Sequence, residues 1–428
     1  MTDVNRRVAI TGMGAITPSG LDVASLWDSV VAGRSAITTL DGPEFADLPV
    51  RIGGQIIGFD ATGIIAPTLA RRLSPVQQWA IVAADQAMRQ AGVIDGAFPG
   101  SAPDQAPGLP WPRERFAVIA ATGSGPIDAM QQATRTLDAS GPRAVPITLS
   151  VYGAPDAAAA ILAQRYRAFG PSQGVSATCA SGAVGLGMGM RWIRHGYADA
   201  VLVVGMEDCL NGVNLASNAR LRALARDYEE DPAAACRPFD RSRSGFVMAS
   251  GAAAILLEAA DARTVLSLAE LAGFGASSDA YHATAPDPGG RGAAQAILEC
   301  LADADVAAVD VDHINAHGTG TQLGDSAEIA ALRTAFGDCG PTIPLTATKS
   351  CTGHLLGASG VVEAIIAVHT LRNGVVPPTI NLTDPEFPDW DVVTGSARNS
   401  AVRSVLSTSF GFGGHNGALL LQEWNEKS

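Results

Sequence analysis

The chain has 428 residues, of which 47% are hydrophobic, and a formal net charge of −13. This length allows a large buried core, while the acidic balance excludes a general nucleic-acid binder, whose phosphate contacts need concentrated Lys and Arg. The six cysteines show neither a Cys-x-x-Cys pair nor a zinc-ligand spacing, so we predict no disulfide framework and no metal site. No apolar run is long enough to cross a bilayer and no segment resembles a targeting signal, so we expect no membrane span and a reducing cytoplasm.

Apolar runs of strand length alternate with segments that suit helices. The predicted strands cover residues 116–121, 200–205, 252–258, 265–272, 313–316 and 402–407. The predicted helices cover residues 75–92, 181–196, 293–302 and 357–374, and the surface loops cover residues 97–112 and 285–292. Because buried parallel strands covered by helices give this alternation, we predict an α/β fold.

Two segments near the N-terminus have counterparts further along the chain. Val-Ala-Ile-Thr-Gly-Met-Gly at residues 8–14 resembles Leu-Ala-Glu-Leu-Ala-Gly-Phe-Gly at residues 268–275. The strand-to-helix turn around Cys179 resembles the turn at residues 349–354. This internal repetition predicts two similar halves.

Cys179 is the strongest candidate for a chemically active residue. It lies in Val-Ser-Ala-Thr-Cys-Ala-Ser-Gly at residues 175–182, where a short apolar strand turns abruptly into a helix. A thiol in the first turn of a helix is close to free backbone N–H groups and to the positive end of the helix dipole, so we expect its thiolate to be favoured. A free cysteine can equally be a small buried side chain, so the prediction depends on its partners.

Two histidines are candidates for those partners. His317 lies in Asn-Ala-His-Gly-Thr-Gly-Thr at residues 315–321, and His354 lies in Lys-Ser-Cys-Thr-Gly-His-Leu-Leu-Gly at residues 349–357. Each alone could be a core histidine, but a reactive cysteine needs a histidine that is adjacent in space and not in sequence. The chain has no complete dinucleotide fingerprint, no Walker A lysine and no Gly-x-Ser-x-Gly elbow, so cysteine chemistry is favoured.

These motifs resemble those of the β-ketoacyl-acyl carrier protein synthases, condensing enzymes of the thiolase superfamily. The resemblance extends from residues 8–20, through Arg-Pro-Phe-Asp-Arg-Ser-Arg-Ser-Gly-Phe-Val at residues 237–247, to Ser-Phe-Gly-Phe-Gly-Gly-His-Asn at residues 409–416. It is greatest to the chain-elongating type, and the last motif resembles the actinobacterial long-chain branch. The resemblance implies a thiolase-like duplicated five-layer αβαβα fold with two mixed sheets. Residues 1–258 would carry the nucleophile and residues 259–428 both histidines.

The resemblance also implies a decarboxylative Claisen condensation. Cys179 would take an acyl group from an acyl carrier protein, and His317 and His354 would stabilise the enolate formed when malonyl-carrier loses CO₂. The backbone N–H groups of Cys179 and Phe412 would hold the second oxyanion, and Phe410 and Phe412 would form a gate in a glycine-rich loop. No metal or organic cofactor is expected, because the phosphopantetheine arm belongs to the carrier.

Five further residues receive supporting roles. Lys349 is expected to pair with Glu328, because a buried ammonium is tolerable only beside a carboxylate. Thr319 and Thr321 would hydrogen-bond the pantetheine amides, with ordinary turn stabilisation as the alternative. Asp325 would cap or orient the following helix.

Four positions depart from the family pattern. Asn218 stands where relatives usually place a phenylalanine near the acyl pocket, and Pro126 stands where an aliphatic side chain commonly limits chain length. Ser244 and Ser250 replace acidic residues. A buried amide beside an alkyl chain is unfavourable unless it is paired, so these changes leave open a specialised acyl chain from secondary metabolism or a modified lipid.

Partners are inferred from the same resemblance. An acidic acyl carrier protein needs a local basic patch, for which the candidates are Arg71, Arg72, Arg143, Arg220 and Arg222. We also expect a homodimer. Two other readings stay open, a silent subunit that only shapes a pocket for an active homologue and a thiolase that uses coenzyme A. The intact Cys179 and histidines oppose the first, and the lack of a second cysteine within residues 410–416 opposes the second.

Overall fold

The computed structural model describes residues 6–95, 108–264 and 266–425. Within these residues, ten strands form one mixed sheet. Across the sheet they are β10 (Leu345–Thr346), β9 (His313–Asn315), β13 (Ser404–Gly411), β14 (His415–Gln422), β8 (Ala269–Ser278), β1 (Val8–Ile16), β7 (Gly251–Ala259), β6 (Ala200–Glu207), β4 (Phe116–Ala121) and β5 (Ser172–Val175). Most of the predicted loop at residues 97–112, and the first residue of the predicted strand at 265–272, lie outside the described residues.

The sheet consists of two halves of five strands that repeat one pattern. In the first half β5, β4 and β6 are parallel, and β7 and β1 run antiparallel to their neighbours. In the second half β10, β9 and β13 are parallel, and β14 and β8 are antiparallel. Among the described strands of the sheet, the halves are joined by β1 and β8, through the pairs Ala9–Glu270 and Ile10–Ala269. The two expected sheets are therefore continuous at one edge, and the joining strands are those that contain the internal repeat.

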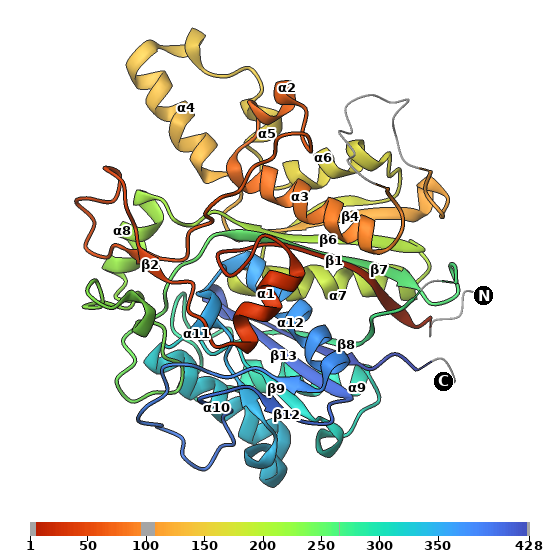
Figure 1. Ribbon diagram of the computed structural model, residues 1–428, viewed down its shortest axis with the longest axis vertical. Coiled ribbons are helices and arrows are strands. Elements are labelled where there is room, and N and C mark those ends of the chain that lie inside the picture. Colours follow the sequence, from red (N-terminus) through yellow and green to blue (C-terminus); the bar gives the residue numbers. More distant parts are fainter. Residues whose placement is uncertain (1–5, 96–107, 265, 426–428) are drawn as a thin grey trace.

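Helices complete five layers, which Figure 1 shows stacked from top to bottom. The outer helices are α3 (Pro75–Gln90) and α6 (Ala157–Tyr166) on the first half and α9 (Arg291–Asp303) and α10 (Gln322–Phe336) on the second, with α7 (Ser181–Arg194) and α12 (Ser359–Asn373) in the centre. The predicted order of layers, αβαβα, is the one observed. The predicted boundary near residue 258 falls close to the end of β7.

The apolar strands explain why both faces of the sheet are covered. Every residue of β4, β6 and β7 is buried. Side chains alternate between faces along a strand, so Val118 and Leu202 pack with the outer helices while Ile119 and Val203 pack in the central layer. A strand with two apolar faces needs a helix layer on each side.

Glycines bring the two central helices into backbone contact. A Cβ atom at Gly182, in the first turn of α7, would lie 2.9 Å from the Val361 nitrogen. A Cβ atom at Gly360, in the first turn of α12, would lie 2.5 Å from the Ala183 nitrogen. Because both helices follow the predicted reactive turns, this contact brings the turn around Cys179 beside the turn around His354.

The remaining elements lie around this core. The other helices are α1 (Val23–Val31), α2 (Pro67–Ala70), α4 (Ile127–Ser140), α5 (Leu149–Tyr152), α8 (Gly212–Arg220) and α11 (Lys349–Thr352). The 3₁₀ turns are η2 (Arg113–Arg115), η3 (Pro142–Ala144), η4 (Thr178–Ala180), η5 (Pro232–Ala234), η6 (Ala308–Asp310), η7 (Gly337–Thr342), η8 (Leu356–Ala358) and η9 (Phe412–Gly414). Two small ladders join β2 (Thr38–Thr39) to β3 (Ile52–Gly53) and β11 (Val375–Val376) to β12 (Arg398–Asn399). Among the helices of the described chain, none combines the length and the apolar character that crossing a membrane requires.

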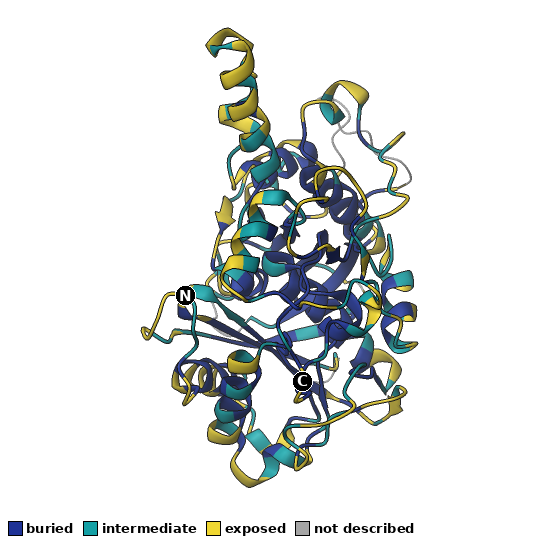
Figure 2. Ribbon diagram, turned by 90° about the vertical axis from the view of Figure 1, so that its left-hand side faces the viewer, coloured by how far each residue is buried: buried dark blue, intermediate teal, exposed yellow. Residues whose placement is uncertain are grey.

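One region, α4 to α5, projects away from the core as an arm (Figures 1 and 2). Ala133 is the buried residue of α4, and the rest of that helix is exposed or half-buried. Met130, Leu137, Ile147 and Val151 on this arm are large apolar residues exposed to solvent.

Candidate active site

Cys179 lies in η4, between the end of β5 and the start of α7. The preceding residue, Thr178, has a φ of 50°, which is uncommon for a β-branched residue. Its hydroxyl lies 2.8 Å from the carbonyl oxygen of Ala177 and 2.9 Å from that of Phe412, and the Ser181 hydroxyl donates to the Thr178 carbonyl at 2.6 Å. These contacts hold the sharp turn that presents the thiol to the cavity.

The expectation that the Cys179 thiolate is favoured is wrong for this structure. Burial raises the pKa of Cys179 to about 12, although Lys349 and the backbone N–H groups of Phe412 and Cys179 act in the opposite direction. Desolvation of the charged sulfur therefore outweighs the favourable environment at the start of the helix. The two N–H groups that favour the thiolate are those predicted to form an oxyanion hole.

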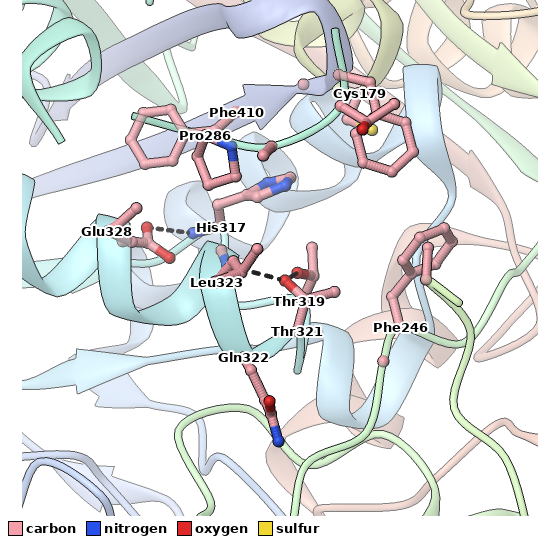
Figure 3. A pocket seen from close by; sticks show the side chains of 18 of the residues that line it. Cys179, Phe246, Pro286, His317, Thr319, Thr321, Gln322, Leu323, Glu328 and Phe410 are labelled. Carbon is pink, nitrogen blue, oxygen red and sulfur yellow. Dashed lines mark hydrogen bonds between the residues drawn. The ribbon is translucent and has the colours of Figure 1, made fainter. Parts of the chain in front are cut away.

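His317 follows β9 and is fixed through its backbone. Its N–H donates to Glu328 Oε1 at 2.8 Å and is 2.9 Å from Thr408 Oγ1, and the Gly318 N–H donates to Glu328 Oε2 at 2.8 Å. The His317 ring extends into the cavity, away from Glu328 (Figure 3). Burial lowers the pKa of His317 well below its usual value, and Lys349 and His354 add to this shift, so the ring is neutral.

His354 follows α11 and a glycine in a left-handed conformation. Gly353 has a φ of 70°, and a Cβ atom there would lie 2.8 Å from Ile37 Cδ1. His354 Nδ1 is 3.0 Å from Ser359 Oγ, and the rings of His354 and His317 are nearly perpendicular with centroids 5.3 Å apart. Burial lowers the pKa of His354 well below its usual value, and Lys349 acts in the same direction, so this ring is neutral as well.

The predicted pair between Lys349 and Glu328 is wrong. Lys349 Nζ pairs with Glu363 of α12, and both side chains are buried. Glu328 instead accepts hydrogen bonds from the backbone of the His317 turn and from Thr408 Oγ1, the last at 2.7 Å. Burial raises the pKa of Glu363 to about 7, while Lys349 opposes this. A sequence signal existed, because a lone glutamate inside the apolar run Val-Val-Glu-Ala-Ile-Ile needs a buried cation.

One cavity of about 630 Å³ brings the three predicted catalytic side chains together. Cys179, His317 and His354 all line it, as do Thr319 and Thr321. The two threonine hydroxyls are 3.1 Å apart and lie on the wall near His317 (Figure 3). The cavity reaches the surface beside the exposed Arg222, Arg226 and Arg241.

The two predicted gating aromatics occupy different elements. Phe410 is in β13, not in a loop, and its ring centroid is 5.8 Å from that of His317. Phe412 is in η9 between Gly411 and Gly413, and its ring centroid is 6.4 Å from that of Phe246. Both rings line the cavity, but only Phe412 has the glycine-flanked backbone that was expected for both.

Of the two roles predicted for Asp325, capping α10 is wrong. Thr321 is the N-cap, since its hydroxyl accepts a hydrogen bond from the Gly324 N–H at 3.2 Å. Asp325 accepts from the N–H groups of Phe239 and Gly320 and forms an ion pair with Arg243 at 3.3 Å. Arg243 lines the cavity and was not predicted, because an arginine between two serines in a loop resembles a surface residue.

The predicted acyl-pocket residues do not line this cavity. Pro126 is buried at the start of α4, and the amide of Asn218 on α8 donates to the Asn214 carbonyl of its own helix at 2.9 Å. Ser244 does line the cavity. Ser250 donates to Asp208 at 2.9 Å, and burial raises the pKa of Asp208 to about 6.

The predicted docking arginines divide into two groups. Arg222 lies at the cavity mouth, next to Arg226 and Arg241, which were not predicted. Arg71 and Arg72 at the end of α2, Arg143 in η3 and Arg220 at the end of α8 are exposed and lie outside the cavity lining.

A thiol, two neutral imidazoles and two backbone donors around one cavity define a thiol-dependent acyltransferase on a duplicated α/β fold. Comparison with known proteins identifies the family to which this acyltransferase belongs. Residues 5–262 match the model of the beta-ketoacyl synthase N-terminal domain, and residues 268–383 match that of the C-terminal domain. The chain belongs to the beta-ketoacyl synthase family, as predicted, and is therefore a ketosynthase. Its placement in the actinobacterial branch stays a prediction.

Relatives match over nearly the full length of the chain. The 3-oxoacyl-[acyl-carrier-protein] synthase 2 of Synechocystis is 35% identical over 424 residues, which are 98% of each chain. A β-ketoacyl synthase from Burkholderia phymatum superposes with a TM-score of 0.87 at 29% identity, covering 98% of this chain and 100% of the other. A chain of AntDE:AntF, a type II polyketide synthase carrier protein in complex with its ketosynthase, gives 0.86 at 27% identity, with 98% and 100% covered.

Proposed function

We propose that this ketosynthase condenses an acyl group, held as a thioester on Cys179, with a malonyl group on an acyl carrier protein to give 3-oxoacyl-acyl carrier protein. The observation that carries the proposal is that Cys179, His317 and His354 line one cavity. The name of the Synechocystis relative supports the carrier-bound substrate.

In the loading step the Cys179 sulfur attacks the acyl thioester of the carrier. Because burial keeps the resting thiol protonated, its proton passes to a neutral imidazole as the new C–S bond forms. The N–H groups of Cys179 and Phe412 stabilise the oxyanion of the tetrahedral intermediate. The bond to the carrier sulfur then breaks, and the carrier leaves as a thiol after it receives that proton.

In the condensation step malonyl-carrier replaces the free carrier. The bond between the malonyl Cα and the carboxylate breaks, CO₂ leaves, and the electron pair forms an enolate. His317 and His354 donate hydrogen bonds to the enolate oxygen; with Nε2 of His354 protonated for this purpose, its Nδ1 is the acceptor for the Ser359 hydroxyl 3.0 Å away. The enolate carbon attacks the acyl thioester, and the departing Cys179 thiolate takes a proton from solvent.

Loss of CO₂ generates the carbanion directly, so the proposed mechanism requires neither a strong base nor a metal or organic cofactor. The phosphopantetheine arm arrives with the carrier. Thr319 and Thr321 are suited to bind its amides, because both line the cavity near His317. Arg222, Arg226 and Arg241 at the mouth would attract the acidic carrier.

A second copy of the chain is the proposed partner of the arm from α4 to α5. Four exposed apolar side chains on this arm, Met130, Leu137, Ile147 and Val151, would be covered in a homodimer. Arg71, Arg72 and Arg143 would then extend the docking surface beyond the cavity mouth. We expect the enzyme in the cytoplasm. A specialised acyl chain stays a prediction, since neither Asn218 nor Pro126 lines the cavity.

Intact-mass analysis of the protein after exposure to a panel of acyl-carrier proteins tests this function. We expect one acyl group per chain, mapped by peptide digestion to Cys179, and the chain-length preference follows from the same panel. Acylation of a different residue would contradict the proposal. Absence of acylation with every carrier, while malonyl-carrier is still bound, would instead support the silent-subunit reading.

A further inference from the structure

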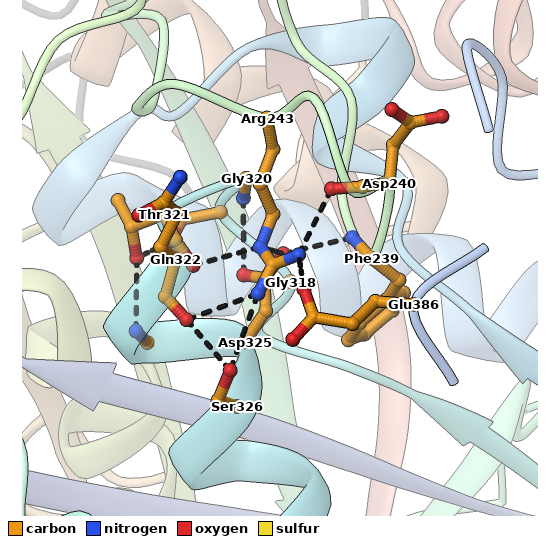
Figure 4. Close-up of polar contacts among 12 residues, drawn as sticks. Phe239, Asp240, Arg243, Gly318, Gly320, Thr321, Gln322, Asp325, Ser326 and Glu386 are labelled. Atoms are coloured by element: carbon orange, nitrogen blue, oxygen red, sulfur yellow. Dashed lines mark hydrogen bonds and ion pairs between the residues drawn. The ribbon is translucent and has the colours of Figure 1, made fainter. Parts of the chain in front are cut away.

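The buried guanidinium of Arg243 lies between three segments near the cavity (Figure 4). Its side chain is 1% exposed. Nε donates to the Thr321 carbonyl at 3.2 Å, and Nη2 donates to the Gln322 carbonyl at 3.0 Å and to Ser326 Oγ at 3.2 Å. Nη1 donates to the Asp240 carbonyl at 2.9 Å and pairs with Glu386. None of the proposed chemical steps uses this residue.

The position of Arg243 is electrostatically unfavourable for a cation, so filling space does not explain why an arginine is found there. It contacts the first turn of α10, where the helix dipole is positive and a cation is disfavoured. Asp325, 3.3 Å away, and Glu386 offset that effect. An apolar side chain would fill the space without requiring two carboxylate partners, so the guanidinium indicates a need for its directed hydrogen bonds.

Those hydrogen bonds restrain a loop that contains two glycines with positive φ angles. Thr319 stands between Gly318, with a φ of 34°, and Gly320, with a φ of 80°. Glycines in this conformation do not fix the backbone by themselves. The loop is held by hydrogen bonds from the Gly320 N–H to Asp325, from the Gly245 N–H to the Gly320 carbonyl and from Arg243 to the Thr321 carbonyl. Thr321 in turn places its hydroxyl 3.1 Å from that of Thr319.

We propose that Arg243 is a positioning residue that fixes the Thr319–Thr321 hydroxyl pair for the amide-bearing arm of the incoming thioester. The inference rests on the proposed function. Arg243 touches no reacting atom in this scheme, so its loss acts on recognition of the arm before it acts on the thiol or the imidazoles. A lysine keeps the charge but not the planar fork, and it cannot reach the Thr321, Gln322 and Asp240 carbonyls together.

Arg243→Lys tests the proposal with two substrates, malonyl-pantetheine, which has two amides, and malonyl ethyl thioester, which has none. We expect KM for malonyl-pantetheine to rise about tenfold with a smaller change in kcat, as for one to two misplaced hydrogen bonds. kcat/KM for the pantetheine thioester should fall at least about fivefold more than for the ethyl thioester. Combined with Thr319→Val, Arg243→Lys should add little further loss, because both disturb one contact.

Two further variants keep the test decisive. Glu386→Gln loosens the guanidinium from its half-exposed partner and should shift KM in the same direction by a smaller factor, which covers the case in which Arg243→Lys does not fold. Arg398→Lys, in the surface pair with Asp391, is the matched control and should not change the ratio between the two substrates. Equal losses on both thioesters, or no loss on either, overturn this inference alone. A wild-type protein that decarboxylates neither thioester overturns the proposed function and this inference with it.

Discussion

The two halves of the molecule repeat one turn with different chemistry. In the first half, β5 leads through η4 into α7 and the turn presents a thiol. In the second half, β10 leads through α11 and η8 into α12, and the equivalent turn presents a buried ion pair and an imidazole. Glycines at the starts of α7 and α12 let the two turns touch. The repeated architecture therefore brings the two turns together, and the first half contributes the thiol to the cavity while the second half contributes both imidazoles.

The largest expected effect on stability comes from the buried ion pair between Lys349 and Glu363 at the second turn. Lys349→Met leaves Glu363 buried without a partner and should lower the free energy of unfolding by about 3–5 kcal/mol. Lys349→Met with Glu363→Leu should recover most of this loss in chemical denaturation. Recovery when Glu328, and not Glu363, is neutralised would show that the pairing described here is incorrect.

The division of labour predicts a selective effect of His317→Ala. Loss of an enolate donor should slow decarboxylation of malonyl-carrier by about two to three orders of magnitude. Acyl loading of Cys179, followed by intact mass, should fall much less, because His354 can still accept the thiol proton. Equal losses in both half-reactions would contradict the proposed separation of acyl loading from decarboxylation.

The contact between the turns can be loosened directly. Gly360→Ala places a Cβ atom 2.5 Å from the Ala183 nitrogen, and the resulting shift should cost about 1–3 kcal/mol of stability. The condensation rate should fall together with stability. Gly108→Ala is the control, because its Cβ atom would point into open space. A Gly360 variant with native stability and native rate would show that close contact of α7 and α12 is unnecessary.

The halves also differ in buried imidazoles, which the second half alone contributes to the core. Burial lowers the pKa of His313 to about 3, from an unfolded value of about 6.5. Below pH 6.5 the unfolded chain binds the extra proton, so this residue's contribution to stability is lost as the pH falls, by about 1.4 kcal/mol per unit down to about pH 3. In His313→Gln the slope of stability against pH should be smaller by nearly this amount below about pH 5.5, and by about half of it at pH 6.5. Identical slopes would contradict the assigned burial.

Some buried elements with a continuous apolar run were predictable from the sequence, whereas a projecting helix and a strand beside a glycine-rich motif were not. The strand at residues 116–121 was predicted with its observed bounds, because every residue is apolar and buried. The helix α4 was missed, because a projecting helix with a polar surface lacks a continuous apolar face to the core. The strand β14, whose apolar run follows the glycine-rich motif, was missed as well.

Within the site, the motifs revealed which residues gather, but not their pairing or their protonation. Cys179, His317 and His354 follow from three motifs, and all three line the cavity. The partner of Lys349 depends on whether Glu328 or Glu363 lies closer to it, and the sequence alone does not give these distances. The resting state of the thiol depends on desolvation, which outweighs the helix dipole only once the folded chain buries the sulfur.

A Cys179→Ala variant tests directly whether the thiol carries the acyl group while the two imidazoles support decarboxylation. We expect this variant to take up no acyl group and to make no 3-oxoacyl product, yet still to release CO₂ from malonyl-carrier, because both imidazoles remain. Condensation by the variant at the wild-type rate would show that Cys179 does not carry the acyl group.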